Sequence, residues 1–125
     1  MRQIKFRAWD GKKTHEDVVV IDGEAYKREY IGNILNPDAR AGMPMQFTGL
    51  KDENEKEIYE GDVVKITVDV SYETSTIPGI IHETRVFIEK VFWDDATLGW
   101  APFLLPIEYS VEVIGNIYEN PELLK

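Results

Sequence analysis

The sequence predicts an all-β fold in which several short strands form a sandwich or a small barrel. Three observations support this prediction. Apolar and polar residues alternate along several segments, as they do along half-buried strands. β-Branched residues are concentrated in those segments. Turn-forming residues separate the segments at intervals of roughly ten residues, which is typical of all-β domains. Closing the sheet would also remove exposed strand edges, which promote aggregation.

The amino-terminal region is predicted to hold one strand followed by a hairpin. Along residues 4–9 apolar and polar positions alternate, and Asp10-Gly11 ends this strand with turn chemistry. Residues 18–21 are β-branched throughout and precede Asp22-Gly23, a pair that tolerates the positive φ of a tight turn. Residues 24–31 form the second arm of this predicted hairpin.

A loop or linker is predicted after this region. Residues 36–44 contain Pro, Asp and Gly and have no apolar period. The chain therefore divides into an amino-terminal β region with its linker, residues 1–44, and a second part, residues 45–125. The two parts are also compatible with one compact domain, given the total length of 125 residues.

The second part is predicted to hold the longer strands. A polar turn at residues 51–56 separates two short strands, and alternation resumes over residues 63–70 after Gly61-Asp62. Residues 80–93 are a further long strand, and an exposed, mobile loop is expected at residues 73–79.

Towards the carboxyl terminus, a turn at residues 94–99 leads into a strand over residues 100–105. The final strand is predicted over residues 111–118. Asn120-Pro121-Glu122 has the cap, proline and acid that begin one short helical turn. The main core is expected to contain Phe47, Ile58, Val64, Ile66, Phe92, Val113 and Ile117.

The charge is unevenly distributed along the chain. The net charge is −9; residues 1–50 carry eight basic and seven acidic side chains (+1), and residues 51–125 carry six and sixteen (−10). An acidic surface repels the phosphate backbone, so binding to duplex nucleic acid is disfavoured. The absence of cysteine excludes disulfides and thiolate metal sites. No signal peptide or membrane-length apolar run is present, so a soluble cytoplasmic protein is expected.

Three stretches resemble the YopX family of phage and prophage proteins. They are residues 4–10, the central pair of residues 45–52 and 57–64, and residues 113–124. The resemblance implies a small phage-encoded cytoplasmic protein whose carboxyl-terminal part, residues 45–125, is an SH3-like barrel. It brings no established activity, cofactor or catalytic residue. The chain departs from the family pattern in having Asn54-Glu55 where Asn-Gly is usual, and residues 71–84 have the length of a local insertion.

The sequence does not place catalytic or metal-ligating residues in a recognisable pattern. A hydrolase needs a nucleophile, a base and an orienting group, but His15 and His82 have no such setting. Neighbouring acids on a strand point to opposite faces, so residues 15–17 do not converge on a metal. No phosphate-binding or dinucleotide-binding glycine motif is present. We therefore expect a protein that is not an enzyme and that uses no cofactor.

One face of the first strand carries Lys5, Arg7 and Trp9, and two interpretations are open. A basic strand with an aromatic side chain has the composition of a single-stranded nucleic-acid platform. Alternatively, Trp9 packs in a second core while Lys5 and Arg7 pair with the acidic half of the protein. The second interpretation is favoured, because three residues do not make a groove.

The leading functional hypothesis is a non-enzymatic accessory protein that binds a host or phage protein. Its surplus of aromatic residues supports this hypothesis, and so does the resemblance to the YopX family. The alternative is a single-stranded nucleic-acid-binding module, and a third, weaker hypothesis is a DNA-mimicking inhibitor. A homo-oligomer is also expected, because residues 1–34 are too few to bury their apolar face alone. They must dock on the same chain or on a neighbour.

Overall fold

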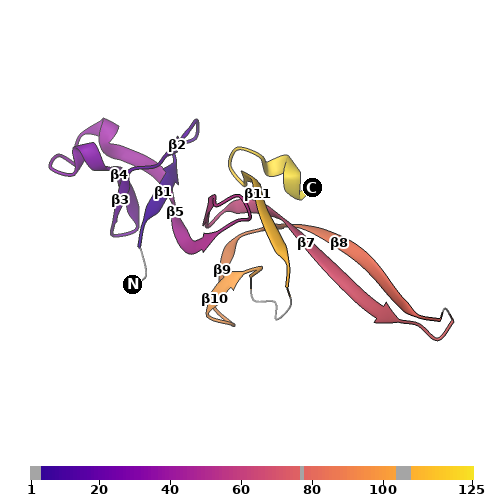
Figure 1. Ribbon diagram of the computed structural model, residues 1–125. Helices are drawn as coiled ribbons and strands as arrows, with labels where there is room; N and C mark the ends of the chain where they lie inside the picture. The colour runs from indigo at the N-terminus through magenta and orange to yellow at the C-terminus, as the bar shows by residue number, and fades with distance from the viewer. Residues whose placement is uncertain (1–3, 77, 104–107) are drawn as a thin grey trace.

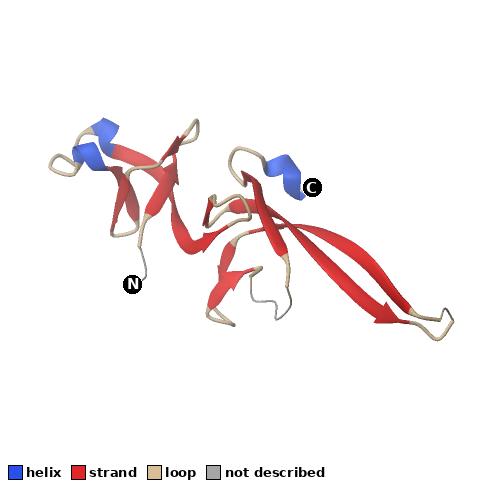
Figure 2. Cartoon of the chain, viewed as in Figure 1, coloured by secondary structure: helices blue, strands red, loops and turns tan. Residues whose placement is uncertain are grey.

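Strands make up nearly all of the regular structure (Figures 1 and 2). The computed structural model describes residues 4–76, 78–103 and 108–125. Within these residues the strands pair antiparallel in three sheets, and the helical segments are short 3-10 turns. The predicted all-β class is confirmed.

The first sheet contains the amino-terminal strands in the order β2-β1-β5-β4-β3, and β6 pairs with the far end of β5. Its members are β1 (Phe6–Trp9), β2 (Thr14–His15), β3 (Val18–Ile21), β4 (Glu24–Lys27), β5 (Arg40–Lys51) and β6 (Glu57–Tyr59). The hairpin about Asp22-Gly23 is confirmed.

The second arm of that hairpin is shorter than predicted. It ends at Lys27 and continues as the 3-10 turn η1 (Arg28–Tyr30). Lys27 pairs with Val18, the first residue of β3, so the backbone beyond Lys27 has no strand opposite it.

The linker predicted over residues 36–44 is wrong from Arg40 onward. After the 3-10 turn η2 (Pro37–Ala39), β5 begins at Arg40 and runs unbroken to Lys51. Gly42 has φ of 100°, and a Cβ there would lie 1.9 Å from the carbonyl oxygen of Trp9, so this glycine permits the close approach of β5 to β1. Pro44 lies beyond the last residue that pairs with β4, where β5 has β1 as its partner on one side, as a proline in a sheet requires. The boundary predicted between residues 44 and 45 therefore falls inside a strand.

The second sheet has the order β11-β7-β8, and β9 and β10 form a separate hairpin. Its members are β7 (Asp62–Glu73), β8 (Ile80–Lys90) and β11 (Ser110–Asn116), and the hairpin consists of β9 (Phe92–Asp94) and β10 (Gly99–Ala101). The turn predicted at residues 94–99 is confirmed, and the predicted final helical turn is the 3-10 turn η3 (Pro121–Leu124). The strand predicted at residues 100–105 ends at Ala101, and residues 104–107 lie outside the described residues.

The SH3-like barrel predicted for residues 45–125 is not what the described residues form. Closure would require a strand bridging the outer edges of β8 and β11. Instead, the outer edge of β11 bonds to the turn that joins β5 and β6, because Glu53 N–H donates to the Val111 carbonyl at 2.9 Å. Strand β8 leaves the body together with β7 as a two-stranded ribbon (Figure 1).

The main core lies between β6, β7 and the β9–β10 hairpin. Its buried members are Ile58, Val64, Ile66, Val68, Val91 and Trp100, so three of the seven predicted core residues are confirmed there. Phe47 is buried in another cluster with Met45 and Tyr59, Val113 packs against the main cluster, and Ile117 is half-buried.

Phe92 was predicted to be in the core but is 43% exposed. The strand predicted over residues 80–93 breaks at Val91, and Val91 fills the core position in place of Phe92. At the far end of the β7–β8 hairpin, Ser75, Thr76, Pro78 and Gly79 are exposed as expected; residue 77 lies outside the described residues.

Candidate functional site

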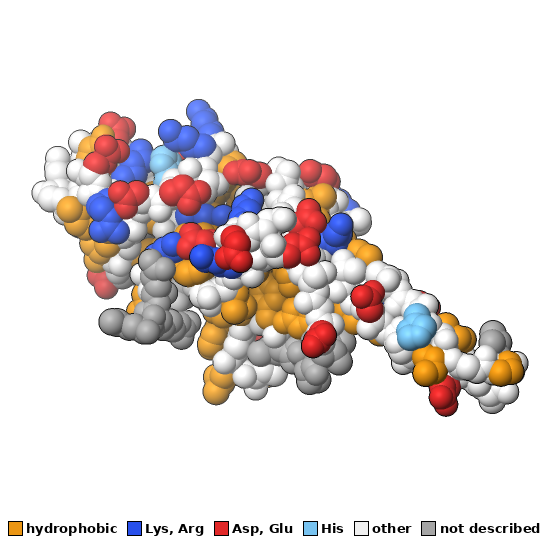
Figure 3. All heavy atoms as spheres, viewed as in Figure 1, with side chains coloured by type: hydrophobic (Ala, Val, Ile, Leu, Met, Phe, Trp, Pro, Cys, Tyr) orange, Lys and Arg blue, Asp and Glu red, His pale blue; other side chains and the backbone are white. Residues whose placement is uncertain are grey.

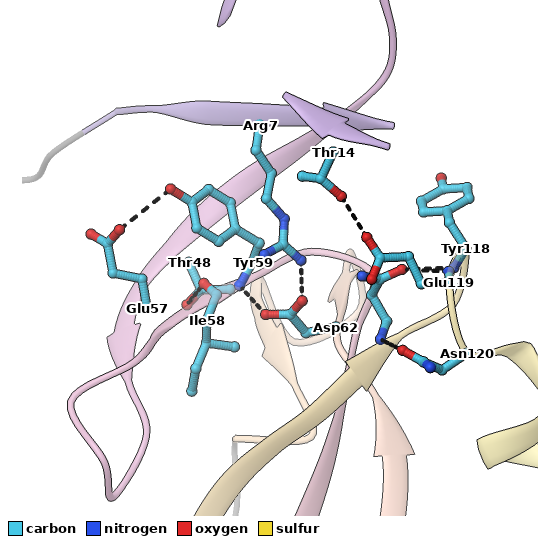
Figure 4. Close-up of polar contacts among 11 residues, drawn as sticks. Arg7, Thr14, Thr48, Glu57, Ile58, Tyr59, Asp62, Tyr118, Glu119 and Asn120 are labelled. Carbon is cyan, nitrogen blue, oxygen red and sulfur yellow. Dashed lines mark hydrogen bonds and ion pairs between the residues drawn. The ribbon is translucent and has the colours of Figure 1, made fainter. Parts of the chain in front are cut away.

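Of the three candidate contact residues, Arg7 lies at the junction between the first sheet and the start of β7 (Figure 4). Arg7 lies on β1 with its side chain only 9% exposed, and its guanidinium forms an ion pair with Asp62, whose side chain is 1% exposed. The guanidinium also lies 4.4 Å from the centre of the Tyr59 ring. The Arg7 guanidinium is therefore occupied by buried contacts within the chain.

Asp62 joins the junction to the backbone of β6. Its second carboxylate oxygen accepts a hydrogen bond from the Tyr59 N–H at 2.8 Å. Burial raises the pKa of Asp62 above its ordinary value, and the charge of Arg7 and the Tyr59 N–H act in the opposite direction. An Asp after a Gly commonly forms a turn in which its side chain bonds to backbone N–H groups, and Asp62 does so with a side chain that is buried rather than exposed to solvent.

Lys5 and Trp9 also contact the rest of the chain. Lys5 forms an ion pair with Glu57, and its ammonium lies 4.7 Å from the centre of the Phe47 ring. Trp9 stacks on Tyr118 with ring centres 6.2 Å apart and planes inclined by 16°. The structure thus shows the second interpretation of this face, in which both cations pair with acids and the tryptophan packs in a second core. The amino-terminal region docks on its own chain.

A second polar centre, Asp52, holds the turn between β5 and β6. Its carboxylate accepts hydrogen bonds from the N–H groups of Asn54, Lys56 and Val113, at 2.8, 2.9 and 2.9 Å. Burial by itself would raise the pKa of Asp52, but these backbone donors outweigh it and the pKa lies below its ordinary value. The sequence pattern predicts a solvated turn here; the structure shows a buried carboxylate that ties the turn to β11.

The turn itself is not the type I′ turn of an Asn-Gly pair. Glu55 has φ of 64°, whereas Asn54 is not among the residues with positive φ. The Glu55 N–H donates to the Asp52 carbonyl at 3.0 Å, and the Asp52 N–H donates to the Lys56 carbonyl at 2.8 Å. This is the three-residue hairpin loop in which one left-handed residue follows a type I turn.

A surface cleft of about 440 Å³ lies beside this turn. Its apolar wall includes Ile58, Phe103 and Val111, and its polar wall includes Asp52, whose oxygens already accept backbone hydrogen bonds. Elsewhere, His82 Nδ1 lies 2.8 Å from Ser71 Oγ on the exposed β7–β8 hairpin. In the part of the chain that the structure describes, no three His, Asp or Glu side chains gather as metal ligands would.

Several exposed apolar side chains follow β8. Figure 3 shows apolar side chains reaching the surface along the hairpin that projects from the body. The most exposed of them on β8 are Ile80 at 59%, Val86 at 55%, Phe87 at 47% and Ile88 at 39%. Among the described strands β8 pairs with β7 alone, so its other side presents unpaired backbone groups from Ile80 to Ile88, which we call the free edge.

The sequence contains a signal for this surface. Residues 71–84 are longer than a tight hairpin needs, and residues 80–93 have the pattern of a strand. The expected insertion is strand rather than loop, because β7 and β8 remain paired as far as Glu73 and Ile80. None of the helices among the described residues has the length and apolar character to cross a lipid bilayer.

Comparisons with known proteins agree with this description. The family model of the YopX protein matches residues 5–125. The SPbeta prophage-derived protein YopX of Bacillus subtilis (strain 168) is 30% identical to this chain over 135 residues, which cover 96% of this chain and 95% of that protein. The crystal structure of protein EF1440 from Enterococcus faecalis matches over 100% of both chains with 27% identity and a TM-score of 0.62. The chain therefore belongs to the YopX family.

Proposed function

We propose that this chain is a prophage accessory protein that acts in the bacterial cytoplasm by binding another protein, without catalysing a reaction. The prophage origin named for the Bacillus subtilis relative supports the first part of this proposal. The binding function rests on the free edge of β8.

A free edge is a binding site because a strand without a neighbour presents a row of N–H and C=O groups to any extended segment that approaches. Proteins usually protect such edges with short strands, charges, prolines or bulges. Strand β8 has eleven residues and, within Ile80–Ile88, two charged side chains, Glu83 and Arg85. Its exposed apolar side chains would add side-chain contacts to the backbone pairing.

The nucleic-acid alternative has less support. A platform for single strands needs cations and aromatic rings open to solvent. Lys5 and Arg7 pair with acids, and Trp9 stacks on Tyr118.

Binding can be tested with charged variants of the free edge. The purified chain, Val86→Lys and Leu35→Lys are each immobilised and exposed to extracts of cells that carry the prophage, and each retained protein is then purified and titrated directly. Leu35 is a matched control because it is 92% exposed and lies in the amino-terminal region. We expect Val86→Lys to bind a partner at least tenfold more weakly than the other two. Equal affinity for all three, or no partner confirmed by titration, would contradict the proposal.

A further inference from the structure

We infer that the partner of the free edge is a second copy of this chain. Two β8 strands pair antiparallel about a two-fold axis at Thr84, and the two hairpins then form one four-stranded sheet. This inference rests on the proposed function and names its partner.

Among the described strands, β8 has a long edge that remains open. In the second sheet the outer edge of β11 is occupied, since Glu53 N–H bonds to the Val111 carbonyl and Val113 N–H bonds to Asp52. In the first sheet the edge strands β2 and β3 have two and four residues, which are too short to template a stable sheet. The amino-terminal face that carries Lys5 and Arg7 is occupied by contacts within the chain.

The open stretch of β8 also has a defined length. Turn η3 lies at the base of the hairpin: Leu123 sits against Gly115, Gly115 pairs with Val63, and Val63 pairs with Lys90. Towards its tip the hairpin stands clear of the body (Figure 1). The stretch left for a partner runs from Ile80 to Ile88, and its middle residue is Thr84.

This stretch is complementary to a second copy of itself when Thr84 lies on the axis. Residues directly opposite in an antiparallel pair share a face and contact each other. With Thr84 opposite Thr84, Glu83 faces Arg85 of the other copy on both sides of the axis. Ile81 then lies opposite Phe87 and Ile80 opposite Ile88, and His82 lies opposite Val86.

Neighbouring registers lose this complementarity. Moving the axis by one residue places Arg85 opposite Arg85 or Glu83 opposite Glu83, and like charges directly opposite each other destabilise a sheet. Moving it to Val86 places Glu83 opposite Glu89. Moving it to Phe87 places Lys90, at the base of the hairpin, opposite Thr84.

Charge also favours contact between copies at this place. Two chains with a net charge of −9 repel each other, so a contact needs a surface without net charge. Glu83 and Arg85 balance each other between Ile80 and Ile88, whereas residues 51–125 as a whole carry −10. In the single chain these two side chains pair with each other at 2.6 Å and are 38% and 55% exposed, so both are available to a partner.

Cysteine cross-linking tests the position of the axis. The chain has no cysteine, so Thr84→Cys introduces the only thiol. On the axis the two Cα atoms are about 4.5–5.5 Å apart, a distance that a disulfide can span. Val86→Cys is a matched control on the same face, and its two copies would lie about 13 Å apart. Under mild oxidation we expect Thr84→Cys to cross-link at least tenfold faster; equal rates at both positions would overturn the inference.

A charge exchange tests the register and separates contact between chains from contact within a chain. Arg85→Glu and Glu83→Arg each lose the internal ion pair, and each places like charges opposite each other in its own homodimer. Mixed together, the two variants again place opposite charges across the axis. By sedimentation over a concentration series around roughly 50 μM, well above the Kd of a micromolar assembly, we expect a dimer for the unmodified chain and a dimer for the mixture. For each variant alone we expect a dissociation constant about tenfold higher.

Two results would overturn the inference: an unmodified chain that sediments as a monomer, or a mixture that associates no better than its separate components. Neither result would decide the proposed function, which the partner titration with Val86→Lys tests separately.

Discussion

At the scale of single residues, the ion pair between Arg7 and Asp62 is a buried contact between the first sheet and β7. Arg7→Met would leave the Asp62 carboxylate buried without its cation, so we expect the free energy of unfolding to fall by about 3 kcal/mol. Arg40→Met is the control, because Arg40 pairs with Glu24 at the surface, where an ion pair contributes under about 1 kcal/mol. Urea unfolding measures both.

The pH dependence of Arg7→Met has a definite sign. Without Arg7 the pKa of buried Asp62 rises further, so the folded variant binds a proton more readily than the unfolded chain does. The difference in the free energy of unfolding between the unmodified chain and Arg7→Met should therefore shrink as the pH falls from neutral. A deficit that grows at acid pH would show that Asp62 is not left buried and charged.

Asp52 stabilises the fold in the opposite pH range. Its pKa is depressed in the folded chain, so its contribution is complete above the unfolded pKa of about 4 and is lost as the pH falls through the folded value. In Asp52→Asn the side-chain NH₂ group cannot accept a hydrogen bond, so one of the three backbone N–H donors loses its partner. We expect the free energy of unfolding to fall by about 2 kcal/mol at pH 7 and by less towards pH 3. Glu53→Gln, at an exposed position in the same turn, is the control and should show neither effect.

The left-handed conformation of Glu55 predicts a stabilising substitution. A non-glycine residue at φ of 64° pays a steric penalty that glycine avoids, so Glu55→Gly should raise the free energy of unfolding by about 1 kcal/mol. Glu53→Gly, at a position without positive φ, should lower it instead, because glycine has more freedom in the unfolded chain. If both substitutions had the same sign, the turn would have another conformation.

Part of the candidate site could be predicted at this scale. A residue pattern such as Gly61-Asp62 indicates a carboxylate that bonds to nearby backbone N–H groups, since that interaction is local. The pairing of Asp62 with Arg7 joins residues that are 55 positions apart, and it depends on how β1 lies against the start of β7. No local pattern contains that information.

At the scale of elements, the turn at the tip of the β7–β8 hairpin should be replaceable. Glu73 and Ile80 are directly opposite, so an Asn-Gly pair in place of residues 74–79 can close the hairpin with a type I′ turn. We expect the free energy of unfolding, measured by thermal denaturation, to change by less than about 1 kcal/mol. A larger loss would show that the replaced segment packs on another part of the molecule.

Alternation predicted most strands correctly, and its failures have local causes. Glycine and proline in residues 36–44 have the composition of a linker, yet Gly42 is there because β5 passes close to the Trp9 carbonyl. Pro44 is tolerated because β5 has a single neighbour at that point. Both reasons concern the neighbouring strand, so a reading of residues 36–44 alone cannot supply them.

At the scale of the whole molecule, the sequence predicts the strands but does not predict which strand edges are paired and which are left open. A closed barrel and an open set of sheets require the same alternation along each strand, and they differ in which edges find partners. Here the Asp52 turn occupies the edge of β11, and the edge of β8 remains open. We therefore assign the open edge of β8 to a binding partner, and specifically to a second copy of the chain.

Hydrogen exchange at several protein concentrations tests this claim most directly. In a free chain the outward-facing N–H groups of β8 exchange rapidly, whereas pairing with another strand protects them. We expect protection of the N–H groups between Ile80 and Ile88 to increase with protein concentration, while protection of the N–H groups of β11 does not change. Exchange from Ile80–Ile88 that is the same at every concentration, or protection that develops only in the amino-terminal sheet, would contradict it.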